Sequence, residues 1–238
     1  MEAFDNQITE RIPRHLGIIL DGNGRWAQQR GEKRMQGHIA GSENVISITR
    51  ACSDLGVEAL SLYAFSTENW KRPVEEVGAL MKLLVRFIQT YLDELNSNRV
   101  RLRTMGDLSR LPLPSRTAID YAKKKTEHNT GMILNIGLNY GGRDEICRAA
   151  ERLFAERGGN DRCSEEELSR HMDTADLPPL DLIIRTGGEK RLSNFMIWQA
   201  AYAELYFSDV LWPDFSKRHL EEAFLEYAKR DRRFGGVK

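Results

Sequence analysis

The stretch Leu16-Gly17-Ile18-Ile19-Leu20-Asp21-Gly22-Asn23-Gly24-Arg25-Trp26 decides the fold of this chain. Its first five residues are apolar or glycine, which predicts a short buried strand. A polar loop with two glycines follows directly, and glycine permits a sharp turn there. Strands that are apolar throughout are typical of parallel sheets, whose ligands bind beyond the carboxyl ends of the strands. The stretch therefore predicts a parallel α/β sheet with a ligand site beginning at Asp21.

The rest of the chain alternates between short apolar runs and longer segments with helical spacing. The predicted strands after the first cover residues 57–65, 99–105, 132–140, 181–185 and 204–207. The predicted helices cover residues 40–55, 74–95, 143–157, 164–172 and 216–232. This alternation predicts one α/β domain over residues 1–238, with a mainly parallel sheet of about six strands covered by helices on both faces. Residues 1–12 are expected to be a flexible N-terminal segment.

The charge balance and the cysteines exclude several classes of protein. The 238 residues carry 35 Lys and Arg against 35 Asp and Glu. A net charge of zero disfavours a nucleic-acid-binding protein, because a phosphate backbone favours a basic surface. The three cysteines form no Cys-x-x-Cys pair, so neither a zinc site nor a disulfide framework is indicated. The N-terminus lacks a signal-peptide layout and no apolar run approaches the ~18 residues that span a bilayer, so we expect a cytoplasmic protein.

Polar loops follow three of the predicted strands, and each is rich in groups that bind phosphate. These loops begin at Asp21, Ser66 and Arg185. Carboxylates, arginines and glycine amides together suit a polyphosphate bound with a divalent metal. Asp21 could hold Mg²⁺, which usually takes one or two protein carboxylates together with substrate phosphates. A glycine-rich turn with a capping aspartate explains the first loop about equally well.

Arg185, Arg191 and Ser193 form a second candidate anion site. Arg191 and Ser193 are expected at the start of a helix that runs through Trp198, and a helix N-terminus attracts anions. The alternative is an N-cap serine beside two solvated arginines. Glu204 opens the last predicted strand and is a second candidate metal carboxylate, although such a glutamate is more often an ion-pair partner.

A series of motifs shows a family resemblance. They are DGNGRWA from Asp21, GH at Gly37, LYAFSTENWKRP from Leu62, NYGGR from Asn139, DLIIRTGGEKRLSNF from Asp181, WQAAYAELYF from Trp198, LWPDF from Leu211 and RRFGG from Arg232. In these motifs, their order and their spacing, the sequence resembles the cis-prenyltransferases of the undecaprenyl diphosphate synthase family. The resemblance extends from about Pro13 to Gly236.

The resemblance implies an enzyme that condenses isopentenyl diphosphate with an allylic diphosphate, commonly farnesyl diphosphate, and makes each new double bond cis. It implies Mg²⁺ as the cofactor and a homodimer as the assembly. The expected product is undecaprenyl diphosphate, a lipid-carrier precursor for cell-wall glycan synthesis, with transient membrane contact at product release. The alternatives are a non-catalytic partner subunit, a short-chain synthase, and an unrelated phosphate-ester enzyme or nucleotide-binding regulator with the same architecture.

The resemblance also implies roles for individual residues. Asp21 and Asn69 would be catalytic, and Asp21 and Glu204 would hold the metal ion. The residues expected around the allylic diphosphate are Gly22, Asn23, Gly24, Arg25, Trp26, Arg34 and His38. Those expected around isopentenyl diphosphate are Arg185, Arg191, Leu192 and Ser193. A loop between the two substrates would carry Ser66, Thr67, Glu68, Asn69, Trp70 and Arg72. Asn69 is a poor general base, so positioning a diphosphate oxygen or a water molecule is an equally good role for it.

A tunnel for the apolar product is expected along the helix at 74–95 and the strands that end at Ala64 and Leu138. Such apolar stripes are more often ordinary core, and the resemblance shifts the interpretation toward a tunnel wall for part of the helix. In short-chain members of the family a bulky residue near the Ala64 position shortens the tunnel, so alanine favours a medium or long product. The C-terminal motif from Arg232 resembles a tail that reaches the partner subunit's site.

Overall fold

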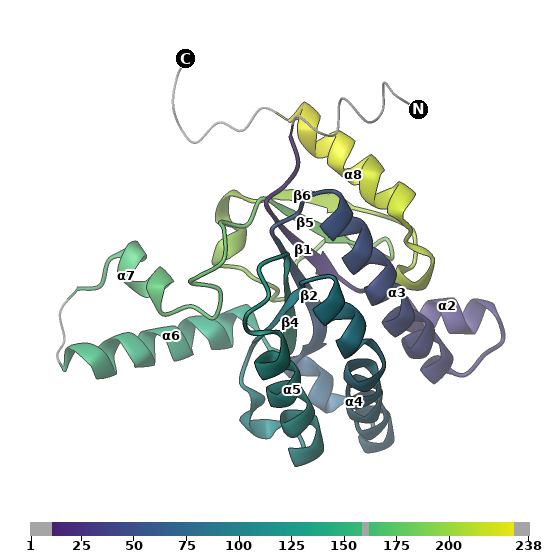
Figure 1. Ribbon diagram of the computed structural model, residues 1–238, viewed down its shortest axis with the longest axis horizontal. Helices are drawn as coiled ribbons and strands as arrows, with labels where there is room; N and C mark the ends of the chain where they lie inside the picture. The colour runs from purple at the N-terminus through teal and green to yellow at the C-terminus, as the bar shows by residue number, and fades with distance from the viewer. Residues whose placement is uncertain (1–10, 159–161, 231–238) are drawn as a thin grey trace.

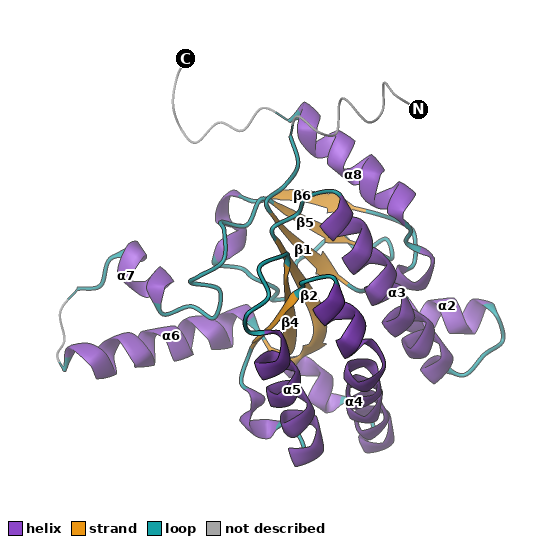
Figure 2. Ribbon diagram, in the orientation of Figure 1, coloured by secondary structure: helices purple, strands orange, loops and turns teal. Residues whose placement is uncertain are grey.

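The structure, a computed structural model, describes residues 11–158 and 162–230. They form a six-stranded sheet in the order β3-β4-β2-β1-β5-β6, and all five strand pairs are parallel. The strands are β1 (His15–Ile19), β2 (Ala59–Ser66), β3 (Arg101–Met105), β4 (Ile133–Tyr140), β5 (Leu182–Arg185) and β6 (Glu204–Phe207). The predicted α/β class with a parallel sheet is confirmed (Figure 2). The RRFGG motif and residues 1–10 of the predicted N-terminal segment lie outside the described residues.

The order of the strands shows where a ligand would bind. The chain passes from β1 to β2 on one side of the sheet, whereas β5 packs on the other side of β1 and leads outward to β6. The carboxyl ends of β1 and β5 therefore flank the point at which the winding direction reverses, where open α/β sheets bind their ligands. Ile19 pairs with Arg185 in the register of these two strands, so the loops that begin at Asp21 and Arg185 start side by side.

Four helices pack against one face of the sheet. They are α3 (Arg34–Asp54), α4 (Val74–Ser97), α5 (Leu113–Thr126) and α8 (Lys217–Lys229). Strand residues such as Leu16, Leu62 and Ile136 pack against their apolar sides in one large core cluster. Burying this apolar surface is the main force that orders the helices on the sheet, at about 25 cal/mol per Å².

The second face of the sheet carries a smaller cluster built around Ile19, Ile183, Phe195 and Met196. The segment of residues 192–203 covers this face with turns and the short 3₁₀-helix η3 (Gln199–Tyr202). Helices were expected on both faces, but the described residues cover this second face with turns and one short 3₁₀-helix.

Two further helices, α6 (Gly142–Arg157) and α7 (Glu165–Arg170), extend away from the sheet (Figure 1). Among the described residues, no helix combines the length and the apolar character needed to cross a bilayer.

Candidate active site

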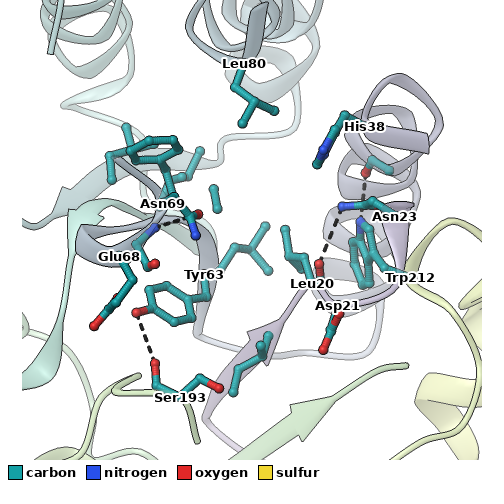
Figure 3. A pocket seen from close by; sticks show the side chains of 18 of the residues that line it. Leu20, Asp21, Asn23, His38, Tyr63, Glu68, Asn69, Leu80, Ser193 and Trp212 are labelled. Carbon is teal, nitrogen blue, oxygen red and sulfur yellow. Dashed lines mark hydrogen bonds between the residues drawn. The ribbon is translucent and has the colours of Figure 1, made fainter. Parts of the chain in front are cut away.

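A cavity of about 850 Å³ extends from the carboxyl edge of the sheet into the space between the sheet and helices α3 and α4. Its polar part is lined by residues from the loops that follow β1, β2 and β5 and by one histidine of α3: Asp21, Asn23, His38, Ser66, Glu68, Asn69, Arg72, Arg185, Arg191 and Ser193. Its apolar part is lined by Val45, Leu62, Ala64, Leu80, Met81, Leu84, Phe87, Ile136 and Leu138. Figure 3 shows the side chains of η1 facing those of Asp21 and His38 across this space. The cavity therefore joins a charged mouth to an apolar interior.

The loop after β1 makes a tight turn into α2 (Asn23–Gln29). Gly22 has a φ of 112°, and a Cβ atom there would lie 2.9 Å from the Leu211 side chain, so only glycine fits without a shift. The first helical hydrogen bond of α2 runs from Trp26 N–H to Gly22 O. The N–H groups of residues 23–25 precede it and have no partner within the helix, which leaves them available to an anion.

Asp21 is surrounded by two arginines. Its Oδ2 accepts a hydrogen bond from Arg185 Nη2 at 2.8 Å, and its Oδ1 lies 3.2 Å from Arg25 Nη2. Thr186 fixes the backbone of Asp21, because its hydroxyl donates to Asp21 O and accepts from Asp21 N–H. The carboxylate is thus oriented on both sides, and the side chain remains 29% exposed toward the cavity.

Arg185 is the most deeply buried cation of the site, with a side chain that is 5% exposed. Its Nη1 donates to Ser193 Oγ at 2.7 Å and to Arg191 O at 2.5 Å. Its Nε is buried without a hydrogen-bond partner among the described residues. A buried donor without a partner is costly, so a guanidinium in this state favours an anionic ligand nearby.

The segment that carries Arg191 and Ser193 is not a helix, so the predicted helix through Trp198 is wrong. Ser193, Asn194 and Met196 have φ values of 48°, 66° and 46°. Such left-handed residues interrupt a right-handed helix and cost energy outside glycine. The anion site at Arg185 therefore rests on side chains held by a strained loop, and not on a helix N-terminus. Arg191 is 62% exposed and pairs with Glu189 at 2.5 Å.

A second basic cluster forms where α3 and α4 begin. Arg72 Nη1, Arg34 Nε and His38 Nε2 lie 3.1, 3.2 and 3.5 Å from one oxygen of Glu76. Burial lowers the pKa of His38, and the positive charges of Arg72 and Arg34 lower it further against the opposing effect of Glu76. The imidazole is therefore neutral at pH 7. Glu76 was not predicted, because nothing in the sequence pattern indicates that this helix residue contacts two arginines and a histidine.

The loop between the two clusters is the 3₁₀-helix η1 (Thr67–Lys71). Asn69 Oδ1 accepts a hydrogen bond from Ser66 N–H at 3.1 Å, so the amide NH₂ is the part of Asn69 left for the cavity. Glu68 accepts a hydrogen bond from Asn194 at 3.1 Å, which joins η1 to the loop after β5. Burial raises the pKa of Glu68, but hydrogen bonds from its own amide and from Ser66, Asn194 and Thr67 outweigh burial and lower it.

Several predicted residues do not line the cavity: Gly22, Gly24, Arg25, Trp26, Arg34, Thr67, Trp70, Leu192 and Glu204. Trp26 instead donates to Asp214 at 2.7 Å and carries Arg30 over its ring. Leu192 packs against the smaller core cluster. Conversely, Tyr63, Arg143, Asn194 and Ile197 line the cavity and were not predicted. Tyr63 lies next to Ala64 in a stretch interpreted as an apolar strand, which concealed its hydroxyl group.

Glu204 lies at the opposite end of the sheet from Asp21. It opens β6 opposite Leu182, the first residue of β5, whereas Asp21 follows Ile19, the partner of the last residue, Arg185. Its carboxylate pairs with Arg230 at 2.8 Å. The two carboxylates therefore do not bind one ion within the same chain, and the ion-pair interpretation of Glu204 describes its contacts in this structure.

The described residues contain no cluster of three metal-ligating His, Cys, Asp or Glu side chains. Two carboxylates line the cavity, Asp21 and Glu68, and Asp21 is the one that lies between two arginines. This donor set does not suit a metal held by protein ligands alone, but it suits Mg²⁺, which commonly takes one or two carboxylates and completes its coordination with substrate phosphates and water.

Comparison with known proteins places the chain in a family. The family model described as "Putative undecaprenyl diphosphate synthase" matches residues 19–235. An isoprenyl transferase of Clostridium perfringens is 49% identical, over 97% of this chain and 93% of that protein. One of Streptococcus thermophilus is also 49% identical, over 97% and 96%.

Solved structures agree with this match. Lavandulyl diphosphate synthase from Lavandula x intermedia, in complex with dimethylallyl diphosphate, is 35% identical with a TM-score of 0.91, over 97% of this chain and 100% of that one. A "probable undecaprenyl diphosphate synthase" from Campylobacter jejuni is 38% identical with a TM-score of 0.79, over 94% and 99%. The chain belongs to the undecaprenyl diphosphate synthase family and is an isoprenyl transferase, of a family whose substrates are allylic and isopentenyl diphosphates.

Proposed function

We propose that this chain condenses isopentenyl diphosphate with farnesyl diphosphate, and that repeated condensation gives a polycis-polyprenyl diphosphate, namely undecaprenyl diphosphate. One observation carries the proposal: a cavity of about 850 Å³ has two basic clusters at its mouth and apolar walls behind them. Two diphosphates repel each other, so bringing them together requires separate cationic sites. The apolar walls suit the growing hydrocarbon, whose burial is favourable by about 0.8 kcal/mol per CH₂ group.

The allylic diphosphate belongs to the amides at the start of α2 and to the cluster of Arg34, His38 and Arg72. Of this cluster, His38 and Arg72 line the cavity, and the exposed Arg34 contacts Glu76 beside them. This placement puts its hydrocarbon beside the apolar residues of α3 and α4, which line the same cavity. As the allylic C–O bond breaks, negative charge accumulates on the leaving diphosphate. Arginines already oriented toward that position stabilise the transition state more than the ground state.

Isopentenyl diphosphate belongs to the cluster of Arg185, Arg191 and Ser193. Arg185 is fixed by Asp21 and Ser193, and the exposed Arg191 would exchange its contact with Glu189 for a phosphate. Asp21 would hold Mg²⁺ between the two diphosphate sites, and the ion would supply neutralisation of diphosphate charge when bound. Glu204 is not part of this proposal within one chain.

Asn69 positions a diphosphate oxygen in the proposed reaction. Its carbonyl oxygen is the only atom of the amide that could accept a proton. This oxygen already accepts a hydrogen bond from Ser66 N–H. The NH₂ group that remains can only donate, so it suits a phosphate oxygen. The proton lost from the new carbocation would then pass to a diphosphate oxygen or to water.

A second candidate function is that of a short-chain synthase, which differs from the proposed enzyme in the length of its product. Ala64 lines the cavity, and no bulky side chain closes it at that position. With Ala64→Leu we expect the products to become shorter while the first addition continues. If wild-type protein stopped after one or two additions in excess isopentenyl diphosphate, the short-chain alternative would be favoured.

The proposal includes a cytoplasmic homodimer that contacts the membrane only when it releases its product, and a role in cell-wall glycan synthesis. The bacterial source of the isoprenyl transferases to which the chain is similar supports the role in cell-wall synthesis. Sedimentation of the purified protein would test the assembly.

Incorporation of labelled isopentenyl diphosphate into farnesyl diphosphate by the purified chain tests the proposed reaction. We expect incorporation with Mg²⁺ and none with excess chelator. A non-catalytic partner subunit would incorporate no label by itself, and an unrelated phosphate-ester enzyme would incorporate none under either condition.

A further inference from the structure

The side chain of Trp70 lies where three strands of the sheet end. Phe65 of β2 packs edge-on against its ring, with centroids 5.1 Å apart. Arg110, in the turn after β3, lies 5.4 Å from the ring centroid. Asn139 of β4 accepts a hydrogen bond from the indole Nε1–H at 2.7 Å. The indole therefore touches a residue from each of three neighbouring elements.

Among these contacts, Asn139 supplies the hydrogen bond to the indole. It is 2% exposed, and both ends of its amide are used. The indole N–H is a donor only, so it must meet the amide oxygen. The amide NH₂ then donates to Asp107 O at 2.7 Å. Asn139 thus bridges η1, through Trp70, to the turn that follows β3.

The backbone at Asn139 explains why asparagine suits this position. Its φ of 47° is left-handed, a conformation that asparagine and glycine tolerate better than other residues. Nearby, a Cβ atom on Gly106 would lie 2.2 Å from Leu138 O, so glycine allows the turn after β3 to approach the end of β4 closely. This approach brings Asp107 O within reach of the Asn139 amide.

We infer that Asn139 is a positioning residue, which sets the conformation of η1 and of the adjoining Asn69 by holding Trp70. A five-residue 3₁₀-helix has few hydrogen bonds of its own, so contacts with the rest of the protein determine its shape. The inference rests on the proposed function of η1, in which Asn69 positions a diphosphate oxygen. Asn139 does not line the cavity, so it acts on the site through Trp70 and η1 and not by contact with a substrate.

Two substitutions break the same hydrogen bond from opposite sides. Asn139→Gly keeps the left-handed backbone accessible and removes the amide. Trp70→Phe removes the indole N–H and keeps an aromatic ring. Each is expected to lower kcat/KM about 10-fold, the factor that corresponds to one hydrogen bond of ordinary net strength. The double variant should be no slower than the slower single variant, because both changes remove one interaction.

Asn135→Gly is the matched control. Asn135 is also an asparagine of β4, is 1% exposed, and donates to Ser61 at 3.0 Å, away from η1. Asn135→Gly should lower the melting temperature about as much as Asn139→Gly does. It should leave kcat/KM within about 2-fold of wild type.

Fluorine NMR of protein labelled with 5-fluorotryptophan supplies a readout that a merely structural role would not move. The chain has four tryptophans, and the Trp70→Phe spectrum identifies the Trp70 resonance by its loss. Asn139→Gly should shift or broaden this resonance and leave the others in place, whereas Asn135→Gly should leave it unchanged.

The inference would be overturned by an unchanged Trp70 resonance in Asn139→Gly, or by losses in kcat/KM that add in the double variant. The variant Asn69→Ala distinguishes failure of the inference about Asn139 from failure of the proposed function. If Asn69→Ala turned over like wild type, the role of η1 in the reaction would be wrong, while the NMR result would still decide whether Asn139 anchors Trp70.

Discussion

Arg185 Nη2 lies 2.8 Å from Oδ2 of Asp21, and this pair joins the ends of β5 and β1 at the centre of the sheet. The contact orients the carboxylate toward the cavity and offsets the charge of an arginine that is almost fully buried. The same two residues would then serve different partners, since Asp21 suits a metal ion and Arg185 suits a diphosphate. The neutral charge balance of the whole chain conceals this local separation of charge.

Asp21→Asn should abolish turnover and leave the protein folded. The amide keeps the size of the side chain but loses the charge that a metal ion requires, so we expect a loss of at least about 100-fold in kcat. Arg185 loses its counter-charge, which should lower the free energy of unfolding by about 1–3 kcal/mol. Isopentenyl diphosphate incorporation and thermal unfolding measure the two effects. Asp54→Asn, at the far end of α3, is the control, and near-normal turnover by Asp21→Asn would refute the assigned role.

Arg191→Ala and Arg34→Ala should affect different substrates. Loss of a charged hydrogen bond to phosphate corresponds to about 10–100-fold in affinity. We expect Arg191→Ala to raise KM for isopentenyl diphosphate by this factor and to change KM for farnesyl diphosphate by less than about 2-fold. Arg34→Ala should do the reverse. Steady-state kinetics with each substrate varied in turn would measure the two KM values. The opposite pattern would contradict the assignment of one cluster to each diphosphate.

Gly37→Ala should separate α2 from α3. A Cβ atom at Gly37 would lie 1.8 Å from Asn23 O, so the start of α2 would have to move. We expect a loss of about 1–3 kcal/mol in the free energy of unfolding and a raised KM for farnesyl diphosphate. Gly78→Ala is the matched helical control, because nothing lies within 4 Å of its Cβ position. It should be neutral or stabilise by up to about 1 kcal/mol. Equal effects of the two substitutions would exclude the proposed clash.

Lowering the pH should destabilise the fold through His15. This side chain is 1% exposed, and its Nδ1 donates to Pro178 O, so Nε2 of the neutral ring accepts from Ser61. Burial lowers the pKa of His15 below its ordinary value of 6.5. The unfolded chain therefore binds a proton first, and stability falls as the pH drops below 6.5, by up to about 1.4 kcal/mol per unit.

His15→Gln removes this titration and keeps a polar side chain. Urea unfolding of both proteins at pH 7.5 and 5.5 should show that wild type loses about 1 kcal/mol more than the variant. Identical losses would mean that His15 does not bind its proton differently in the two states.

Most of the strands were predictable because they are short apolar runs bounded by polar loops, as with the stretch around Ile18, and β3 was predictable because it alternates charged and apolar residues. Helix α2 was not predicted, since glycines 22 and 24 disguise it as a turn. The helix expected through Trp198 does not form, because Ser193 and Asn194 have a left-handed backbone that the amino-acid composition does not indicate. Local pattern identifies elements, but it does not report strain imposed by packing.

The candidate site was predictable to the extent that it follows strand ends. Asp21 and Arg185 meet because parallel neighbours end at one edge. Glu76 and Asn139 were missed, because their roles depend on contacts between helix and loop that arise only after folding. Glu204 shows the converse: a matching motif residue lies at the far end of the sheet.

The mass distribution of products made from farnesyl diphosphate and excess isopentenyl diphosphate by the purified chain, with Mg²⁺, tests the account most directly. We expect a ladder of polyprenyl diphosphates that differ by one five-carbon unit and that accumulate as a long product, with no ladder from Asp21→Asn. Absence of a ladder from the wild-type chain, or a ladder that ends after the first or second addition, would contradict the claim that this cavity both condenses the two substrates and holds a long hydrocarbon chain.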